Sequence, residues 1–188
     1  DDRQQGYLKI ESLDEFKSLL QLNPEDEWYD YDVILCKPWS VAKVKKMKLI
    51  KRGFRSLLKD PTIFFNEKKQ SIKLHFDMNH GYGNLEKAAS VLPETERNDF
   101  LNYVSSKTWL IGHCIFISKN KKIMNAFYND LFTWLEKCEK IFGFDSMSYD
   151  TKRIYSFLTE RYMPFWFEKY SKVLTWPWVF FDISKYDN

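Results

Sequence analysis

Cysteine is scarce in this chain, and several familiar signatures are missing. The 3 cysteines, Cys36, Cys114 and Cys138, are widely spaced and form no CxxC pair, which is typical of a reduced, cytosolic protein with buried thiols. No apolar run approaches ~18 residues and no signal peptide is visible, so we expect no membrane span. The P-loop, GxGxxG, GxSxG and HExxH motifs are also absent, which removes the best-known nucleotide, hydrolase and metalloprotease sites.

What the chain does have is a large apolar and aromatic content. Hydrophobic residues make up 44% and aromatic residues 18% of its 188 positions, which is enough for a packed core and argues against disorder. The length predicts one domain, residues 1–188. The net charge of +3 does not by itself imply nucleic acid, but it suits acidic phosphates or a membrane surface. Because the chain opens at Asp1 without a methionine, we interpret it as the C-terminal portion of a longer domain.

The order of expected elements predicts a helix-rich α/β fold with a small mixed sheet. Strands are expected at residues 31–35 and 109–118, and an edge strand in the apolar tail after residue 172. Ser12 with Glu15 predicts a capped first helix, and Asn120 and Gly143 predict the ends of a long one. Helices are expected at residues 11–20, 40–58, 93–107, 120–143 and 148–172.

One charged residue lies where an apolar one is expected. At about 100° per residue, Arg161 falls inside an apolar sector of the last helix, made by Ile154, Phe157, Leu158 and Phe165. Removing a charge from water is costly unless it is paired. Arg161 therefore has either a buried carboxylate partner or a place in a pocket that holds an anion. Pro164 is expected to interrupt the same helix.

The helix expected at residues 40–58 carries a dense basic cluster, Lys43 to Arg55, beside one apolar face. A solvated helix face explains such a cluster, and so does attraction to a phosphate-bearing substrate or to anionic lipid. Peripheral contact with the inner face of a membrane is thus one expectation. Nucleic acid is not expected as a partner, because the cluster is confined to one helix and the net charge is modest.

Other residues are weaker candidates. His113 lies in the predicted strand beside Gly112, where the missing side chain lets another group approach closely. His80 precedes a Gly-Tyr-Gly loop that looks like a site loop. Asp1 and Asp2 are paired carboxylates of the kind that hold a divalent cation on a diphosphate.

Four motifs carry a resemblance to a known family. The strand YDVIL spans residues 31–35, and residues 80–85 are similar to a histidine-bearing loop that ends in a leucine. Residues 112–119 are similar to a strand of the type G-x-x-M-F-I-x-K, and residues 153–161 are similar to a helix of the type R-x-x-x-F-L-S-E-R. In this order they resemble a bacterial family of capsular and exopolysaccharide glycosyltransferases, long catalogued only as a domain of unknown function. The resemblance covers roughly residues 28–170, and it implies the second half of a GT-A-like domain.

The resemblance implies a transfer of sugar from a nucleotide-diphosphate donor to a growing capsular or surface glycan, with Mn²⁺ or Mg²⁺ as a candidate cofactor. It implies Glu160 or His113 as the base that deprotonates the acceptor. Arg153 and Arg161 would bind phosphate or order the acidic partner. The remaining assignments are His80 and Tyr82 on a donor or acceptor loop and Trp39 as a sugar-stacking platform. The alternative is a non-catalytic carbohydrate-binding or scaffold module.

Overall fold

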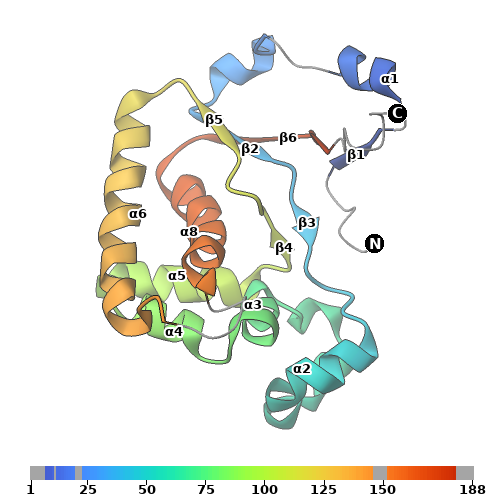
Figure 1. Cartoon of the computed structure of the whole chain (residues 1–188), viewed down its shortest axis with the longest axis vertical. Helices are drawn as coiled ribbons and strands as arrows, with labels where there is room; N and C mark the ends of the chain where they lie inside the picture. The colour runs from blue at the N-terminus through green and yellow to red at the C-terminus, as the bar shows by residue number, and fades with distance from the viewer. Residues whose placement is uncertain (1–6, 11, 20–22, 146–151, 181–188) are drawn as a thin grey trace.

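A computed structural model describes residues 7–10, 12–19, 23–145 and 152–180 of the chain. Helices and a small mixed sheet confirm the predicted fold class, and Figure 1 shows the helices α4, α5, α6 and α8 gathered on one side of the strands. The helices are α1 (Leu13–Ser18), α2 (Lys46–Lys59), α3 (Ile72–His80), α4 (Asn84–Ala89), α5 (Glu94–Ser106), α6 (Lys121–Phe142) and α8 (Ile154–Tyr170). Short 3-10 turns are η1 (Asp26–Asp30), η2 (Pro61–Phe64) and η3 (Glu67–Lys69).

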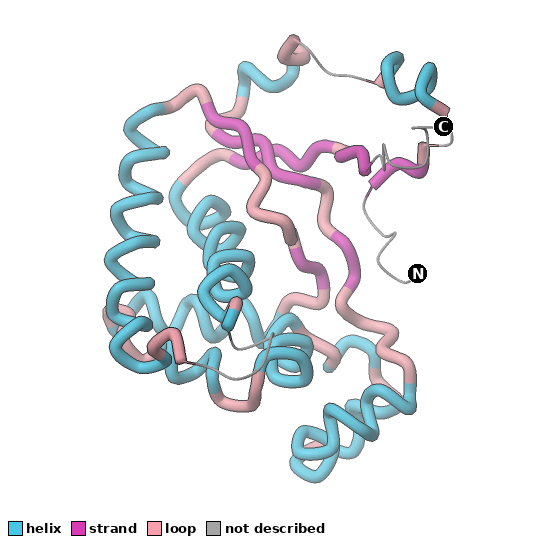
Figure 2. Tube along the Cα trace, in the orientation of Figure 1, coloured by secondary structure: helices cyan, strands magenta, loops and turns pink. Residues whose placement is uncertain are grey.

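The sheet is built from strands that lie far apart in the sequence. Strand β2 (Val33–Cys36) is central, antiparallel to β5 (Phe116–Ser118) and parallel to β6 (Val173–Trp176). The tail is therefore an edge strand, as predicted. All four residues of β2 are buried, as expected for the middle of a covered sheet. The strand segments in Figure 2 also include two small pairs, β3 (Trp39–Ser40) with β4 (Trp109–Leu110) and β1 (Tyr7–Lys9) with β7 (Trp178–Phe180).

Helix α8 lies at the centre of the molecule. It runs between α6 and the strands in Figure 1, and every residue from Arg161 to Phe167 is buried. A helix that is buried on all sides is expected to be apolar all round, and this segment is, apart from Arg161. Pro164 lies within α8 without ending it, but its nitrogen cannot donate to the carbonyl of Glu160.

Large aromatic side chains fill the core between α8, α5 and α6. Phe100 contacts the rings of Trp134, Tyr162 and Phe165 at centroid distances of 5.8, 5.9 and 5.3 Å. The indole nitrogen of Trp134 donates to the carbonyl of Ala88 at 2.8 Å, so this buried polar group is satisfied. The core thus consists of interlocking rings from three helices, with one buried tryptophan fixed by a backbone bond.

A second, smaller core lies under α2. Its buried residues are Leu49, Ile63, Leu74 and Met78. Helix α2 approaches α3 through Gly53, where an added Cβ would lie 2.9 Å from Cδ1 of Leu49 and 3.2 Å from Sδ of Met78. The glycine therefore permits the close contact by which α2 is attached.

Two predicted elements differ from the observed ones. The helix expected from Ser40 begins only at Lys46, because Ser40 ends strand β3 and residues 41–45 are held in an irregular segment by side chains. The hydroxyl of Ser40 accepts from the amide of Ala42 at 3.2 Å, and Oε1 of Gln70 accepts from the amide of Val44 at 2.9 Å. Such bonds give the backbone an alternative to the helix.

The predicted continuous strand at residues 109–118 is broken into β4 and β5. His113 and Cys114 lie between them with φ of 71° and 48°, which no strand tolerates. The predicted helix ends, by contrast, are confirmed. Asn120 accepts from the amides of Lys122 and Ile123, Ser12 accepts from the amide of Glu15, and α6 ends at Gly143 with φ of 58°.

Candidate functional site

Arg161 is the buried charge that the sequence predicted, and it has a carboxylate partner. Only 1% of the residue is exposed, and Nη1 donates to Oε2 of Glu160 at 2.7 Å and to the carbonyl of Phe157 at 3.0 Å. The guanidinium also lies over the ring of Phe76, 5.3 Å from its centroid. Its Nε is buried without a hydrogen-bond partner. Burial lowers the pKa of Arg161, and the charge of Glu160 opposes that shift.

Glu160 differs from its partner because it reaches the surface. Its side chain is 24% exposed, whereas that of Arg161 is 1% exposed. The bond at 2.7 Å fixes one carboxylate oxygen, which is the geometry of a charge-assisted hydrogen bond. Arg161 therefore orders its acidic neighbour, which is one of the two roles predicted for it. Glu160 is a carboxylate held in one orientation with access to solvent.

Two histidines of α3, the half-buried His75 and the buried His80, belong to the same cluster. Nη2 of Arg161 lies 3.2 Å from Nδ1 of His75, which accepts this bond when the ring carries its proton on Nε2. Burial, and then the charge of Arg161, holds the pKa of His75 well below its usual value. The same causes, with the charge of Lys48, lower the pKa of His80 to about 3. Both rings are therefore neutral at physiological pH.

His75 was not assigned to the site from the sequence. The signal in the sequence is its spacing of five residues from His80, and two histidines at that spacing do not fix a metal geometry. The cluster formed by Arg161, Glu160, His75 and His80 is called the Arg161 cluster below.

The ring of Phe157 connects the Arg161 cluster to Arg153. The His80 ring stacks on it with centroids 3.8 Å apart, and the guanidinium of Arg153 lies 5.5 Å from its centroid. Arg153 is exposed and occupies the N-cap position of α8, where the helix dipole favours anions. Two predicted site residues, Arg153 and His80, thus meet on the ring of Phe157, which precedes Glu160 and Arg161 by about one turn of α8.

His113 does not lie in a buried strand, contrary to prediction. It is exposed in the turn between β4 and β5, and its ring lies 4.7 Å from that of Trp178. Its neighbour Cys114 is electrostatically linked to the cluster. Cys114 is exposed, so the expectation of a buried thiol is wrong here, although Cys36 and Cys138 are buried as expected. Partial loss of water around the Cys114 thiol and the nearby charge of Glu160 raise its pKa to about 11, so the sulfur stays protonated.

Trp39 explains the glycine beside His113. An added Cβ on Gly112 would lie 3.1 Å from Nε1 of Trp39, so the predicted close approach is confirmed and the approaching group is this indole. The ring of Trp39 is half-buried and meets His75 edge to face, with centroids 5.6 Å apart. Trp39 therefore adjoins the Arg161 cluster, and its role in stacking on a sugar stays a prediction.

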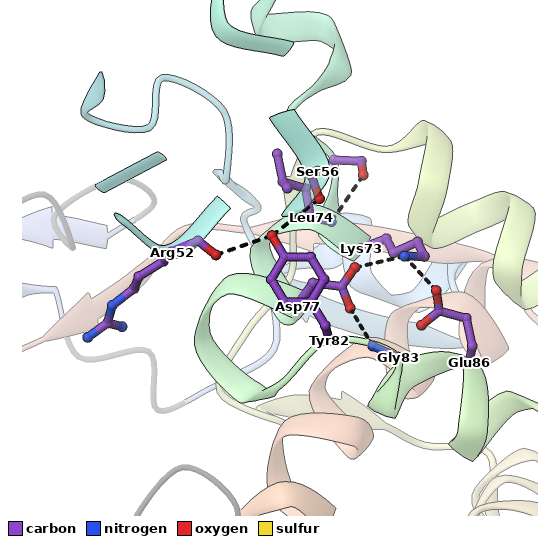
Figure 3. A network of polar contacts seen from close by, with 9 residues as sticks. Arg52, Ser56, Lys73, Leu74, Asp77, Tyr82, Gly83 and Glu86 are labelled. Carbon is purple, nitrogen blue, oxygen red and sulfur yellow. Dashed lines mark hydrogen bonds and ion pairs between the residues drawn. The ribbon is translucent and has the colours of Figure 1, made fainter. Parts of the chain in front are cut away.

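Tyr82 lies in a different place from His80, although only Gly81 separates them. Its hydroxyl donates to the carbonyl of Arg52 at 3.2 Å and accepts from the hydroxyl of Ser56 at 3.3 Å, so it is tied to α2 (Figure 3). Gly81, with φ of 98°, turns the chain between the two residues. The predicted donor loop therefore contacts two helices, α8 through His80 and α2 through Tyr82.

Tyr82 lines a pocket of about 570 Å³, a volume suited to a small molecule. Figure 3 shows its polar wall, in which Lys73 bonds to Asp77 at 2.7 Å and to Glu86 at 2.6 Å. Burial raises the pKa of Asp77, which is only 3% exposed, despite the bond from Lys73. None of the residues that line this pocket belongs to the Arg161 cluster.

The residues that the structure describes do not form a metal site. Asp1 and Asp2 fall outside the described residues, and among those described no three His, Cys, Asp or Glu side chains gather to hold an ion. The nearest pair, Asp77 and Glu86, is already bridged by the ammonium of Lys73. No step below is therefore assigned to a metal.

The basic cluster from Lys43 to Arg55 lies on α2 and the segment before it, and its charged side chains are exposed. In the part of the chain that the structure describes, no helix combines the length and apolar character needed to cross a bilayer.

Comparison with known proteins gives one match. No curated protein and no solved structure is similar to this chain at a significant level. The likeness to half of a GT-A domain therefore stays a prediction. A family model, described as "Domain of unknown function (DUF4422)", matches residues 17–172. That range contains every predicted site residue except Asp1 and Asp2, and it covers most of the sequence, so the chain belongs to the DUF4422 family.

Proposed function

We propose that this chain is part of a glycosyltransferase that moves a sugar from a nucleotide-diphosphate donor to a capsular or surface glycan acceptor. One observation carries the proposal. Arg153 of the motif R-x-x-x-F-L-T-E-R and the distant His80 both contact the ring of Phe157, and three residues further along α8 the carboxylate of Glu160 is fixed by Arg161 and partly exposed to solvent.

In this proposal Glu160 is the base. Its carboxylate accepts the proton of the acceptor hydroxyl as the new glycosidic bond forms and the nucleoside diphosphate leaves. Arg161 is a positioning residue, because its guanidinium is buried against Glu160 and Phe76 and does not reach a substrate. His113 is the weaker base candidate, because it lies in the exposed turn beside Trp178.

Arg153 receives the diphosphate of the donor. It is exposed, cationic and next to the N-terminus of α8, so the side chain and the helix dipole favour the same anionic group. The neutral ring of His80 contributes at most an N–H donor, because its pKa of about 3 excludes a charged form.

A non-catalytic carbohydrate-binding or scaffold module is the second candidate. The observation that favours it is that Nη1 and Nη2 of Arg161 are both paired inside the core, with a carboxylate, a carbonyl and an imidazole. A structural ion pair needs no substrate to account for it.

Thermal denaturation distinguishes the transferase from the non-catalytic module. Tm is measured with UDP, GDP and their glucose and galactose derivatives, each with and without manganese. The transferase proposal expects a diphosphate-dependent rise in Tm that Arg153→Ala removes. If none of these nucleotides changes Tm while plain glycans still bind, the module is favoured.

Glu160→Gln tests the assignment of the base. We expect sugar transfer to fall about 100-fold or more, with Tm and nucleotide binding retained, because the amide still accepts from Arg161. Glu168→Gln is the matched control, since Glu168 is a surface carboxylate of the same helix that contacts Tyr103 and Lys107. Equal activity of Glu160→Gln and Glu168→Gln would reject Glu160 as the base.

A further inference from the structure

Helix α2 has two apolar faces, and only one of them is covered. Leu49 and Gly53 are the buried residues of this helix, and they face α3. The larger apolar side chains lie elsewhere on the helix and are exposed to solvent: Met47 by 62%, Ile50 by 44%, Phe54 by 56% and Leu58 by 68%. The helix stands at the edge of the molecule in Figure 1, away from the sheet.

The four exposed side chains form a single stripe. At about 100° per residue they fall within about 80° of one another around α2. Phe65, just after the η2 turn that adjoins α2, is 82% exposed and adds a further uncovered ring. Exposed apolar residues scattered singly are ordinary, but a contiguous stripe of large ones marks an interaction surface.

The charges of α2 indicate what covers this stripe. The helix contains six basic residues and no acidic one. At about 100° per residue, Lys51 and Arg55 lie directly beside Leu58 on one flank of the stripe, while Lys46 borders Ile50 on the other. A wide apolar stripe between Lys and Arg side chains is the pattern of a helix that lies in the interface of an anionic bilayer.

We propose that α2 docks this chain on the surface of an anionic membrane, with Met47, Ile50, Phe54 and Leu58 inserted between the lipid headgroups. The flanking Lys and Arg side chains then lie at the level of the lipid phosphates. A second copy of this chain suits the stripe less well, because self-pairing would bring six like charges of each helix together. The inference stands independently of the proposed sugar transfer.

Cosedimentation with vesicles tests the proposal on the intact chain. We expect binding to vesicles of phosphatidylcholine mixed with phosphatidylserine and about tenfold weaker binding to phosphatidylcholine alone. Phe54→Ser and Lys51→Glu should each weaken binding to the anionic vesicles about tenfold. Both residues lie on the exposed side of α2, so neither change should lower Tm by more than a few degrees.

Two variants of α6 are matched controls. Phe132 is 55% exposed, almost as much as Phe54, and Lys137 is exposed like Lys51. Phe132→Ser and Lys137→Glu should leave vesicle binding unchanged. The proposal is overturned if the chain does not sediment with anionic vesicles, or if Phe54→Ser sediments as the parent chain does. It is equally overturned if light scattering shows a dimer that Phe54→Ser dissociates, because the stripe is then a protein interface.

Discussion

The surroundings of α8 and those of α2 are opposites in the same small protein. Helix α8 is buried from Arg161 to Phe167 and is held by rings from α5 and α6. Helix α2 buries only Leu49 and Gly53, and it rests on a core of four buried residues. Both helices carry apolar residues and arginine, so composition alone does not separate them. What separates them is which face of each helix is covered.

This difference in covering determines whether an arginine on each helix needs buried partners. On α8, Arg161 is removed from water and needs Glu160, His75 and the ring of Phe76 around it. On α2, Arg52 reaches Oδ1 of Asn79 at 3.2 Å at the surface, where charge costs little. Arg161 and His80 are therefore part of the packed interior as well as of the proposed site. The residues of the α2 stripe are exposed, so we expect their substitution to leave the fold intact.

Truncating an aromatic side chain in each region should give the largest contrast. Phe100→Ala removes a fully buried ring that contacts Trp134, Tyr162 and Phe165, and we expect it to lower the free energy of unfolding by about 3–5 kcal/mol. Phe54→Ala removes an exposed ring and should cost less than about 0.5 kcal/mol. Urea denaturation measures both. Similar losses in the two variants would mean that the α2 stripe is covered in solution.

Removing the buried guanidinium should have the next largest effect. Arg161→Ala leaves a cavity and deprives Glu160 of its partner, and we expect a loss of about 3 kcal/mol in the free energy of unfolding. Arg52→Ala, which removes a surface guanidinium from α2, is the matched control and should cost under about 1 kcal/mol. If Arg161→Ala melts like the parent chain, Arg161 is not part of the core.

Acid should weaken the α8 region through His75 and His80 of α3, which pack against it. The folded-state pKa of His80 is about 3 and its ordinary value is 6.5, so below pH 6.5 the unfolded chain binds a proton that the folded chain refuses. Stability is therefore unaffected above that pH and falls as pH drops from 6.5 toward 3. His80 alone should account for about 1–2 kcal/mol at pH 5, and His75 adds a loss in the same direction.

Urea titrations between pH 7.5 and 5 measure this loss. His80→Phe keeps the stacking on Phe157 but should flatten the pH dependence. Phe132→Ser, an exposed change on α6, should leave it as steep as in the parent chain. A parent chain equally stable at pH 7.5 and 5 would contradict the lowered pKa values of the two α3 histidines.

The sequence predicted the elements whose signals are local. The caps at Ser12 and Asn120, the stop at Gly143 and the buried strand at β2 each depend on a few adjacent residues, and all are confirmed. The break at His113 and Cys114 could not be predicted in this way. The apolar run from Trp109 to Ser118 favours a strand throughout, and only the packing of Trp39 on Gly112 and of Trp178 on His113 reveals the turn.

The site was predictable to a similar degree. The charge of Arg161 within an apolar sector indicated a buried partner, and Glu160 is adjacent in the sequence. The contact of His75 with Arg161 could not be predicted, because it depends on how α3 crosses α8. The separation of Tyr82 from His80 depends on the φ of 98° at Gly81, which a Gly-Tyr-Gly motif permits but does not require. The exposure of the apolar face of α2 could not be predicted either. The periodicity of the sequence identifies an apolar stripe but does not show whether another element covers it.

A methyl group added at Gly53 should give the smallest effect and shows how loosely α2 is attached. The new Cβ of Gly53→Ala would meet Cδ1 of Leu49 at 2.9 Å and Sδ of Met78 at 3.2 Å. Both atoms belong to flexible side chains of a core with only four buried residues, so the overpacking cost should stay near about 1 kcal/mol. Alanine in place of glycine stabilises a helix interior by about 1 kcal/mol, which offsets that cost.

The free energy of unfolding of Gly53→Ala should therefore lie within about 1 kcal/mol of the parent value. Gly53→Leu is the sharper companion, because a side chain with three further carbons cannot fit between Leu49 and Met78 without moving α2 away from α3. Amide hydrogen exchange should then rise along α2 but not along α8, since the aromatic core does not depend on this contact. If Gly53→Ala alone costs more than about 2 kcal/mol, the contact of α2 with α3 is as rigid as the core around α8, and the contrast between the two regions fails.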